Sequence, residues 1–164
     1  MRELLRQQTT LTLELAMHAL QAALQAAENE HLKISIAIVD AAGQLVHMAH
    51  MDNAPLHSRD IARNKALTAL AFGVPTGSWQ QRLANCSTAV QQGLPLQANM
   101  ALFGGGEPFH AAGQVIGAIG ISGASEQLDC LCAEAARAKV ERLLSAQVKN
   151  PGSQEQDDKP IPSP

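Results

Sequence analysis

The pattern of apolar and polar positions in the first third of the chain predicts a helix followed by a β-hairpin. Over residues 10–29 apolar side chains recur every three or four positions, which predicts an amphipathic helix. Its apolar stripe comprises Leu13, Met17, Leu20 and Leu24. Residues 33–39 alternate with period two, turn residues follow at 40–43, and residues 44–51 are extended again. We expect these two segments to pair as antiparallel strands.

The middle of the chain predicts two helices and a loop. Ser58 or Asp60 can cap a helix that continues to Phe72 and ends at Gly73. Its face of small residues would let it lie close to a sheet. A shorter helix follows with Thr76 as its N-cap, and residues 91–95 indicate a loop.

The last third predicts two or three strands and a long helix. Apolar runs at 100–103 and 115–121 indicate strands, and residues 107–110 can form another between them. Ser125 can cap a final helix over residues 126–146. The order of elements suits an α+β fold in which one antiparallel sheet lies between helical layers. We expect one domain over residues 1–146 and a disordered, proline-rich tail over 147–164.

Composition and charge argue against several classes of function. The net charge of −3 and the 2% aromatic content leave little with which to bind nucleic acid. No apolar run approaches the roughly 20 residues that span a bilayer, and the first residues do not resemble a secretory signal. Three cysteines at irregular spacing indicate reduced thiols. We therefore expect a cytoplasmic protein that binds neither nucleic acid nor membrane.

Glycines mark a candidate ligand-binding region. Gly104, Gly105 and Gly106 follow an expected strand, and their backbone N–H groups could converge on a ligand. A tight strand connection explains the run equally well. Gly120, inside the last strand, costs stability unless a backbone or a ligand approaches closely. Ser122 would line the resulting cavity.

Histidine and charged residues supply candidate chemistry. The six histidines show no metal-chelating spacing, but an iron tetrapyrrole needs only one axial ligand. The histidines that could serve are His18, His47, His50 and His57. Arg59, Arg63 and Lys65 belong either to a solvated helix face or to a site where Lys65 turns inward and binds a ligand carboxylate. Glu107 and His110 could exchange protons with a substrate.

Several motifs resemble the GlcG/HbpS family, which includes the C-terminal domain of PduO-type corrinoid adenosyltransferases. They are VDAAGQL at 39–45, MD at 51–52, NKA at 64–66, PT at 75–76, FGGGEP at 103–108 and IGAIGISGA at 116–124. The resemblance implies a profilin-like layered sandwich, with a sheet of about five strands flanked by helices, that assembles into dimers and up to octamers. Some members bind haem, and the Pro-Thr motif implies Thr76 as a haem contact.

Three hypotheses follow. In the first, a homo-oligomer binds a small cofactor or metabolite, with haem as the named candidate, near the glycine run and a subunit boundary. Thr76 or His18 approaches the iron, while Lys65 or Arg63 neutralises propionates. In the second, a cofactor-free lyase, hydratase or isomerase acts on a small oxygenated metabolite. Glu107 and His110 exchange protons with it, Lys65 holds its carboxylate, and the amides of residues 104–106 stabilise an oxyanion. In the third, the protein is a self-assembling scaffold.

Overall fold

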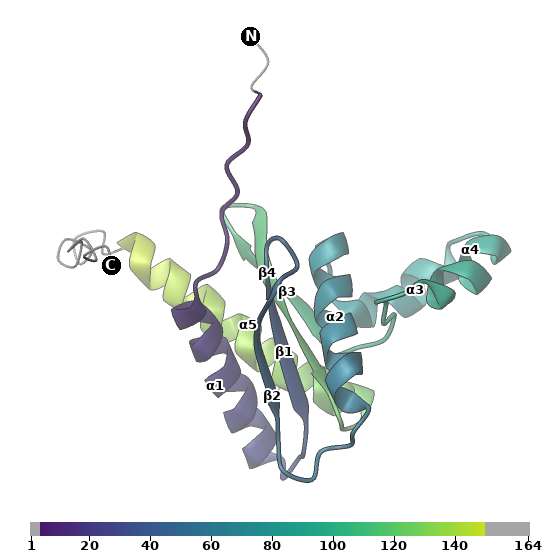
Figure 1. The fold of residues 1–164 in the computed structure, drawn as a ribbon, viewed down its shortest axis with the longest axis horizontal. Helices are drawn as coiled ribbons and strands as arrows, with labels where there is room; N and C mark the ends of the chain where they lie inside the picture. The colour runs from purple at the N-terminus through teal and green to yellow at the C-terminus, as the bar shows by residue number, and fades with distance from the viewer. Residues whose placement is uncertain (1–3, 150–164) are drawn as a thin grey trace, which may run out of the picture.

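One antiparallel sheet organises the chain (Figure 1). The computed structural model describes residues 4–149. The strands are β1 (Ser35–Asp40), β2 (Leu45–His50), β3 (Gly106–Ala111) and β4 (Gln114–Ser122), in the spatial order β2-β1-β4-β3. Each neighbouring pair is antiparallel, which confirms the predicted α+β class. The sheet of the described residues has four strands rather than about five.

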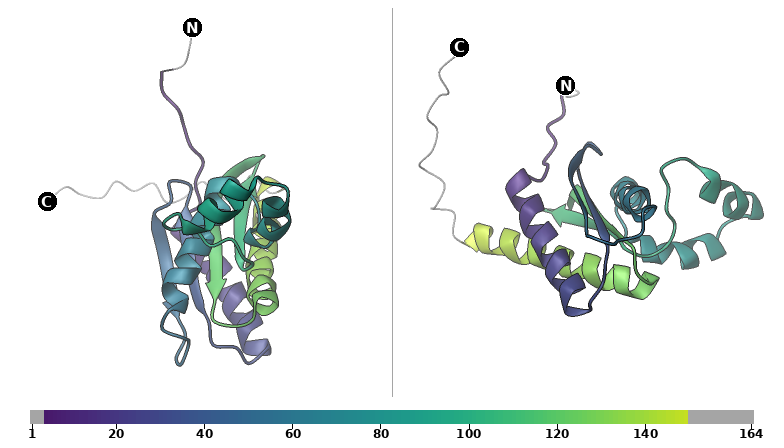
Figure 2. Two further views of the ribbon diagram at one scale, coloured as in Figure 1. Left: turned by 90° about the vertical axis from the view of Figure 1, so that its right-hand side faces the viewer. Right: turned by 60° about the horizontal axis from the view of Figure 1, so that its bottom comes forward.

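Helices cover both faces of the sheet, as Figure 2 shows. On one face α1 (Leu13–Asn29) and α5 (Glu126–Lys149) pack against Ile36, Ile38, Ile119 and Ile121. The intervening strand residues face the other side, because successive side chains of a strand point in opposite directions. There Ala37, Val39 and Ala118 meet the alanines of α2 (Ser58–Phe72).

Helix α2 approaches the sheet as closely as its small residues predict. A Cβ at Gly120 of β4 would lie 1.9 Å from the backbone oxygen of Ala62 and 2.6 Å from the nitrogen of Ala66. The neighbour that requires Gly120 is therefore the backbone of α2 and not a ligand. The helix ends at Gly73, whose φ of 65° is the left-handed conformation expected of a glycine C-cap. His57 occupies the N-cap position without a side-chain bond, so capping by Ser58 or Asp60 is wrong.

The apolar stripe predicted for α1 is partly wrong. Leu20 is buried, but Leu13 is 59% exposed and Met17 is 37% exposed. Small residues instead fill the contact with the sheet and α5: Ala16, Ala19, Ala23 and Ala27. The prediction placed the buried face by the spacing of large apolar residues. The close contact with the sheet and α5 is instead made by alanines, so the predicted face was wrong.

Four short helices lie between α2 and β3. They are η1 (Thr76–Ser78), α3 (Trp79–Ala84), α4 (Thr88–Gly93) and η2 (Leu94–Leu96). Helices α3 and α4 project away from the sheet in Figure 1, and α4 has no buried residue. The loop predicted at 91–95 is therefore wrong, since those residues belong to α4 and η2. The strand predicted at 100–103 is also wrong, because that segment has no ladder partner in the structure.

The final helix runs from Glu126 to Lys149, three residues into the segment expected to be a tail, and residues 150–164 lie outside the described part. Ser125 accepts a hydrogen bond from Leu128 N, as a cap should. Across residues 4–149, no helix combines the length and hydropathy that a membrane span requires.

Candidate functional site

Lys65 is the most deeply buried charged side chain near the glycine run. It is 1% exposed, and its Nζ donates to Asp129 Oδ2 and to the carbonyl oxygen of Ile121, each at 2.8 Å. The ammonium also lies 4.9 Å from the centre of the Phe103 ring. Lys65 therefore turns inward as one hypothesis expects, but the carboxylate it meets is the chain's own. The contact ties α2, β4 and α5 together.

The backbone of the glycine run is largely bonded to neighbouring elements. Gly104 N donates to Glu126 Oε1 at 2.7 Å, and Gly106 N donates to Thr76 Oγ1 at 2.8 Å. A Cβ at Gly105, whose φ is +115°, would lie 2.6 Å from the carbonyl oxygen of Ile121. The run is thus a close-packed connection into β3. Two of its three amides are unavailable to an oxyanion, so that part of the acid–base hypothesis does not fit the structure.

Thr76 is fully buried and holds the start of β3 in place. Its hydroxyl oxygen accepts from Gly106 N, whereas the predicted N-cap bond is absent and Pro75 occupies the cap position. The capping prediction is therefore wrong. A ligand could reach Thr76 only by displacing the glycine run, because the side chain has no exposed surface.

Glu107 and His110 line one cavity beside β3. This cavity, the Glu107 cavity, has a volume of about 440 Å³ and lies among β3, α5 and the start of η1. Two residues of α5, Arg137 and Glu134, form part of its wall. The register of β3 and β4 shifts between the pairs Phe109–Gly117 and His110–Val115, where Ile116 of β4 is left without a partner. The cavity lies beside the edge strand β3, and both the buried Glu107 and the exposed His110 line it.

The carboxyl group of Glu107 is buried and poorly partnered. The residue is 5% exposed, and its Oε2 lies 3.2 Å from Arg137 Nε without a hydrogen-bond alignment. Arg137 also bonds Glu141 Oε1 at 2.7 Å. Burial raises the pKa of Glu107 from 4.5 to about 7, opposed by Arg137 and reinforced by Glu134 and Glu141. Such a group exchanges protons near neutral pH.

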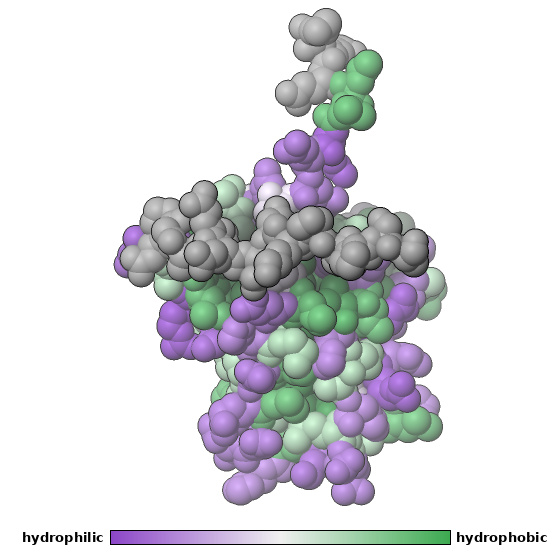
Figure 3. Space-filling view, turned by 60° about the vertical axis from the view of Figure 1, so that its left-hand side comes forward, coloured by the Kyte–Doolittle hydropathy of each residue, from purple (hydrophilic) through white to green (hydrophobic). Residues whose placement is uncertain are grey.

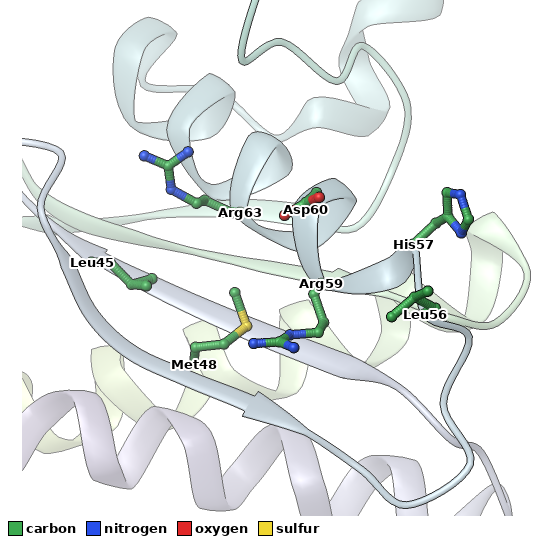
Figure 4. A pocket seen from close by; sticks show the side chains of 7 residues that line it. All are labelled: Leu45, Met48, Leu56, His57, Arg59, Asp60 and Arg63. Atoms are coloured by element: carbon green, nitrogen blue, oxygen red, sulfur yellow. The ribbon is translucent and has the colours of Figure 1, made fainter.

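A second cavity lies between β2 and α2 (Figure 4). This β2–α2 cavity has a volume of about 550 Å³. Leu45 and Met48 of β2 form one side, and α2 with the residue before it supplies the imidazole of His57 and the guanidinium groups of Arg59 and Arg63. Asp60 and Leu56 complete the lining. The cavity combines an apolar wall, two cations and a histidine.

The remaining predicted residues lie elsewhere. His18 is half-buried on α1, in the layer that contains α5, whereas Thr76 and Arg63 belong to the α2 side of the chain. Ser122 is buried in β4 opposite Ser35. His18, Thr76, Lys65 and Ser122 line neither cavity described above. The structure thus brings Glu107 together with His110, and Arg63 together with His57, but does not join the two pairs.

Sequence reasoning gave no role to three residues that shape these sites. Asp129 is the partner of Lys65, Arg137 faces Glu107, and Glu126 binds the glycine run. Their spacing on the last helix was a signal, and the family resemblance also includes an acidic residue at Asp129. Asp129 is buried in its first turn, and Arg137 lies two turns later on the side that faces β3.

Comparisons with known proteins give consistent results. The model of the family described as "Haem degrading protein HbpS-like" matches residues 11–138. A 15.0 kDa protein of Citrobacter freundii from the dhaT-dhaS intergenic region is 35% identical over 138 residues, covering 80% of this chain and 92% of that protein. The crystal structure of Klebsiella pneumoniae protein ORFY has 30% identity and a TM-score of 0.79, covering 86% of this chain and 97% of that chain. The crystal structure of a PduOC:haem complex has 30% identity and a TM-score of 0.73, covering 80% and 95%.

Proposed function

Since the chain belongs to the HbpS-like family, we propose that it is a haem-binding protein of the cytoplasm and that the β2–α2 cavity holds the tetrapyrrole. The observation that carries the proposal is the lining of that cavity. An imidazole, two guanidinium groups and an apolar wall are the groups that an amphipathic, dianionic macrocycle requires. A structural relative crystallised as a haem complex supports the same ligand.

The donor set fits haem residue by residue. His57 offers an exposed imidazole at one end of the cavity, and Arg63 lies at the other end, as Figure 4 shows. Arg59 and Arg63 would neutralise the propionates, while Leu45 and Met48 would pack against the ring. A volume of about 550 Å³ lies within the range of cofactor sites. Bound there, haem would supply a redox-active iron centre.

Thr76 and His18 fit this role less well in the chain as folded. Thr76 has no exposed surface and its hydroxyl oxygen is engaged by Gly106 N. His18 is accessible, but on α1, where it would need a wall from another copy of the chain. We retain His18 as the alternative axial ligand and test both histidines.

Hemin titration of the purified protein tests the proposal. We expect a Soret shift, weakened about tenfold or more by His57→Ala and by Arg63→Ala, because each removes an iron ligand or a charge-assisted contact. His31→Ala, at an exposed position after α1, is the matched control. If His18→Ala abolishes the shift while His57→Ala leaves it unchanged, the assigned cavity is wrong. A flat spectrum at high hemin concentration would overturn haem binding itself.

We also propose that several copies assemble, as dimers and up to octamers. Apolar side chains lie exposed on the side that carries α1 and the end of α5, where Figure 3 shows green surface among purple. Leu13 and Met17 contribute exposed apolar area from α1. Light scattering after size exclusion tests the assembly, and a monomer at micromolar concentration would contradict it.

Acid–base catalysis at Glu107 is a second candidate function. A carboxyl group whose pKa is about 7, in a cavity shared with His110, suits proton exchange with a small oxygenated metabolite. Lys65 would act here only by positioning, because its ammonium is committed to Asp129. Glu107→Gln should abolish turnover without dissolving the assembly, and full activity of that variant would exclude the role.

A further inference from the structure

Two adjoining cavities beside β3 differ in chemical character. The Glu107 cavity is lined by charged groups, whereas a neighbouring cavity of about 420 Å³ has an apolar wall that includes Leu144 and Val148 of α5. His110 and Glu141 belong to the linings of both. The two therefore adjoin at these side chains, and one ligand could occupy both. We call the second one the Leu144 cavity.

Charge in the Glu107 cavity favours a cation. Three carboxyl groups, those of Glu107, Glu134 and Glu141, surround a single guanidinium, that of Arg137. Arg137 already forms ion pairs with Glu107 and Glu141, so its guanidinium is largely occupied and binds an incoming anion poorly. Burial and the nearby carboxylates raise the pKa of the Cys130 thiol, which therefore stays protonated and adds no charge to the cavity.

The buried carboxyl group of Glu107 indicates where a ligand would bind. Its Oε2 is ion-paired with Arg137 Nε at 3.2 Å but forms no aligned hydrogen bond, although the residue is 95% buried, and a buried carboxylate that lacks hydrogen bonds is costly. A donor in the cavity would add a hydrogen bond to this carboxyl group. Residues 4–149 contain no group of three His, Cys, Asp or Glu side chains placed to hold a metal ion. An organic cation with N–H donors would match both the negative charge of the cavity and the missing hydrogen bond at Glu107.

We infer that the Glu107 and Leu144 cavities together form a binding site for an amphipathic primary amine, whose ammonium group contacts Glu107 and whose apolar tail lies against Leu144 and Val148. The inference goes beyond haem binding, since it concerns a different part of the molecule from the β2–α2 cavity. A hemin titration that shows no binding would not contradict the amine site, and a failure to bind amines would not contradict haem binding.

Calorimetric titration with three eight-carbon probes tests the charge requirement. We expect octylamine to bind, and octanoate and 1-octanol to bind at least tenfold more weakly. Glu107→Gln should weaken octylamine at least tenfold, because the amide carries no charge. Glu28→Gln, at an exposed position on α1, should not change it. Equal binding of octanoate, or unchanged octylamine binding by a folded Glu107→Gln protein, would overturn the inference.

Chain length and pH test the rest of the site. Affinity should rise about fourfold for each methylene buried between butylamine and octylamine. Val148→Ser should remove part of that gain without unfolding the protein, because Val148 is 81% exposed. Binding should weaken about tenfold or more from pH 8 to pH 5.5 as Glu107 gains a proton, with His110, Glu134, Arg137 and Glu141 as the other titratable groups facing it. Affinity independent of both length and pH would contradict the proposed contacts.

Discussion

Two buried carboxyl groups near the glycine run, those of Asp129 and Glu107, differ in their partners and surroundings. Asp129 accepts from Lys65 Nζ through one oxygen and from Ala124 N through the other, in a region with no open volume at Gly105. Glu107 is about as deeply buried, but its Oε2 meets Arg137 Nε at 3.2 Å without an aligned hydrogen bond, and the residue lines a cavity. Burial raises the pKa of both groups, and Lys65 and Ala124 oppose the rise for Asp129.

The difference separates a structural carboxylate from one available for chemistry. A buried ion pair with satisfied hydrogen bonds contributes to a unique arrangement of α2, β4 and α5, but offers nothing to a ligand. A buried carboxyl group that lacks hydrogen bonds costs stability, and such groups are found preferentially at functional sites. Of the two carboxyl groups, therefore, the one available to a ligand is that of Glu107 and not that of Asp129, which Lys65 holds.

Removing Lys65, the cation that pairs with Asp129, should have the largest effect on stability. Lys65→Met leaves Asp129 buried without its charged partner, so the free energy of unfolding should fall by about 3–5 kcal/mol. Urea unfolding monitored by circular dichroism measures it. Lys33→Met, at an exposed site, should change stability by less than about 0.5 kcal/mol. A loss below about 1 kcal/mol for Lys65→Met would show that the pair does not organise this region.

Neutralising Glu107 should act in the opposite direction, with an effect that grows from pH 4.5 and levels off above about pH 7. The pKa of Glu107 rises from 4.5 in the unfolded chain to about 7 in the fold, so the stability it contributes is complete below pH 4.5 and lost as pH rises to 7. Glu107→Gln should therefore match the parent at pH 4 and exceed it by up to about 3 kcal/mol at pH 8. Glu28→Gln serves as the control, and a destabilised Glu107→Gln protein at pH 8 would refute the assignment.

Thr76→Val should give the smallest effect of the three. It removes the acceptor of Gly106 N, a buried donor at the boundary of the two regions, and should cost about 1–2 kcal/mol. Hydrogen exchange at the Gly106 amide measures the loss locally. Thr9→Val, at an exposed position, is the matched control. Unchanged protection of that amide would mean that Thr76 has another role.

Periodicity predicted those elements whose local pattern agrees with their surroundings. The hairpin of β1 and β2, the helix α2 with its Gly73 terminus, and strand β4 follow from alternation and turn residues. The buried face of α1 did not follow, because alanines and not leucines pack there. Helix α4 was missed because it has no buried residue and so lacks an apolar stripe. Hydrophobic periodicity therefore does not locate a buried helix face made of small side chains, or a helix that buries no side chain.

Residues of the sites could be listed from the sequence, but their pairing could not. Lys65 was expected to turn inward, yet its partner Asp129 is 64 positions away and belongs to another layer. Alternation along a strand predicts that Glu107 and His110, three positions apart, point to opposite faces, yet both line one cavity beside the edge strand β3. The glycines were expected to admit a ligand. They instead admit neighbouring backbone and the side chains of Thr76 and Glu126.

Carbon-13 NMR titration of the side-chain carboxyl groups tests the difference between the two regions most directly. The signal that disappears in Glu107→Gln should titrate near pH 7 in the parent protein, and octylamine should move that midpoint lower by stabilising the ionised form. A Glu107 signal with a midpoint near 4.5, unchanged by octylamine, would contradict the account.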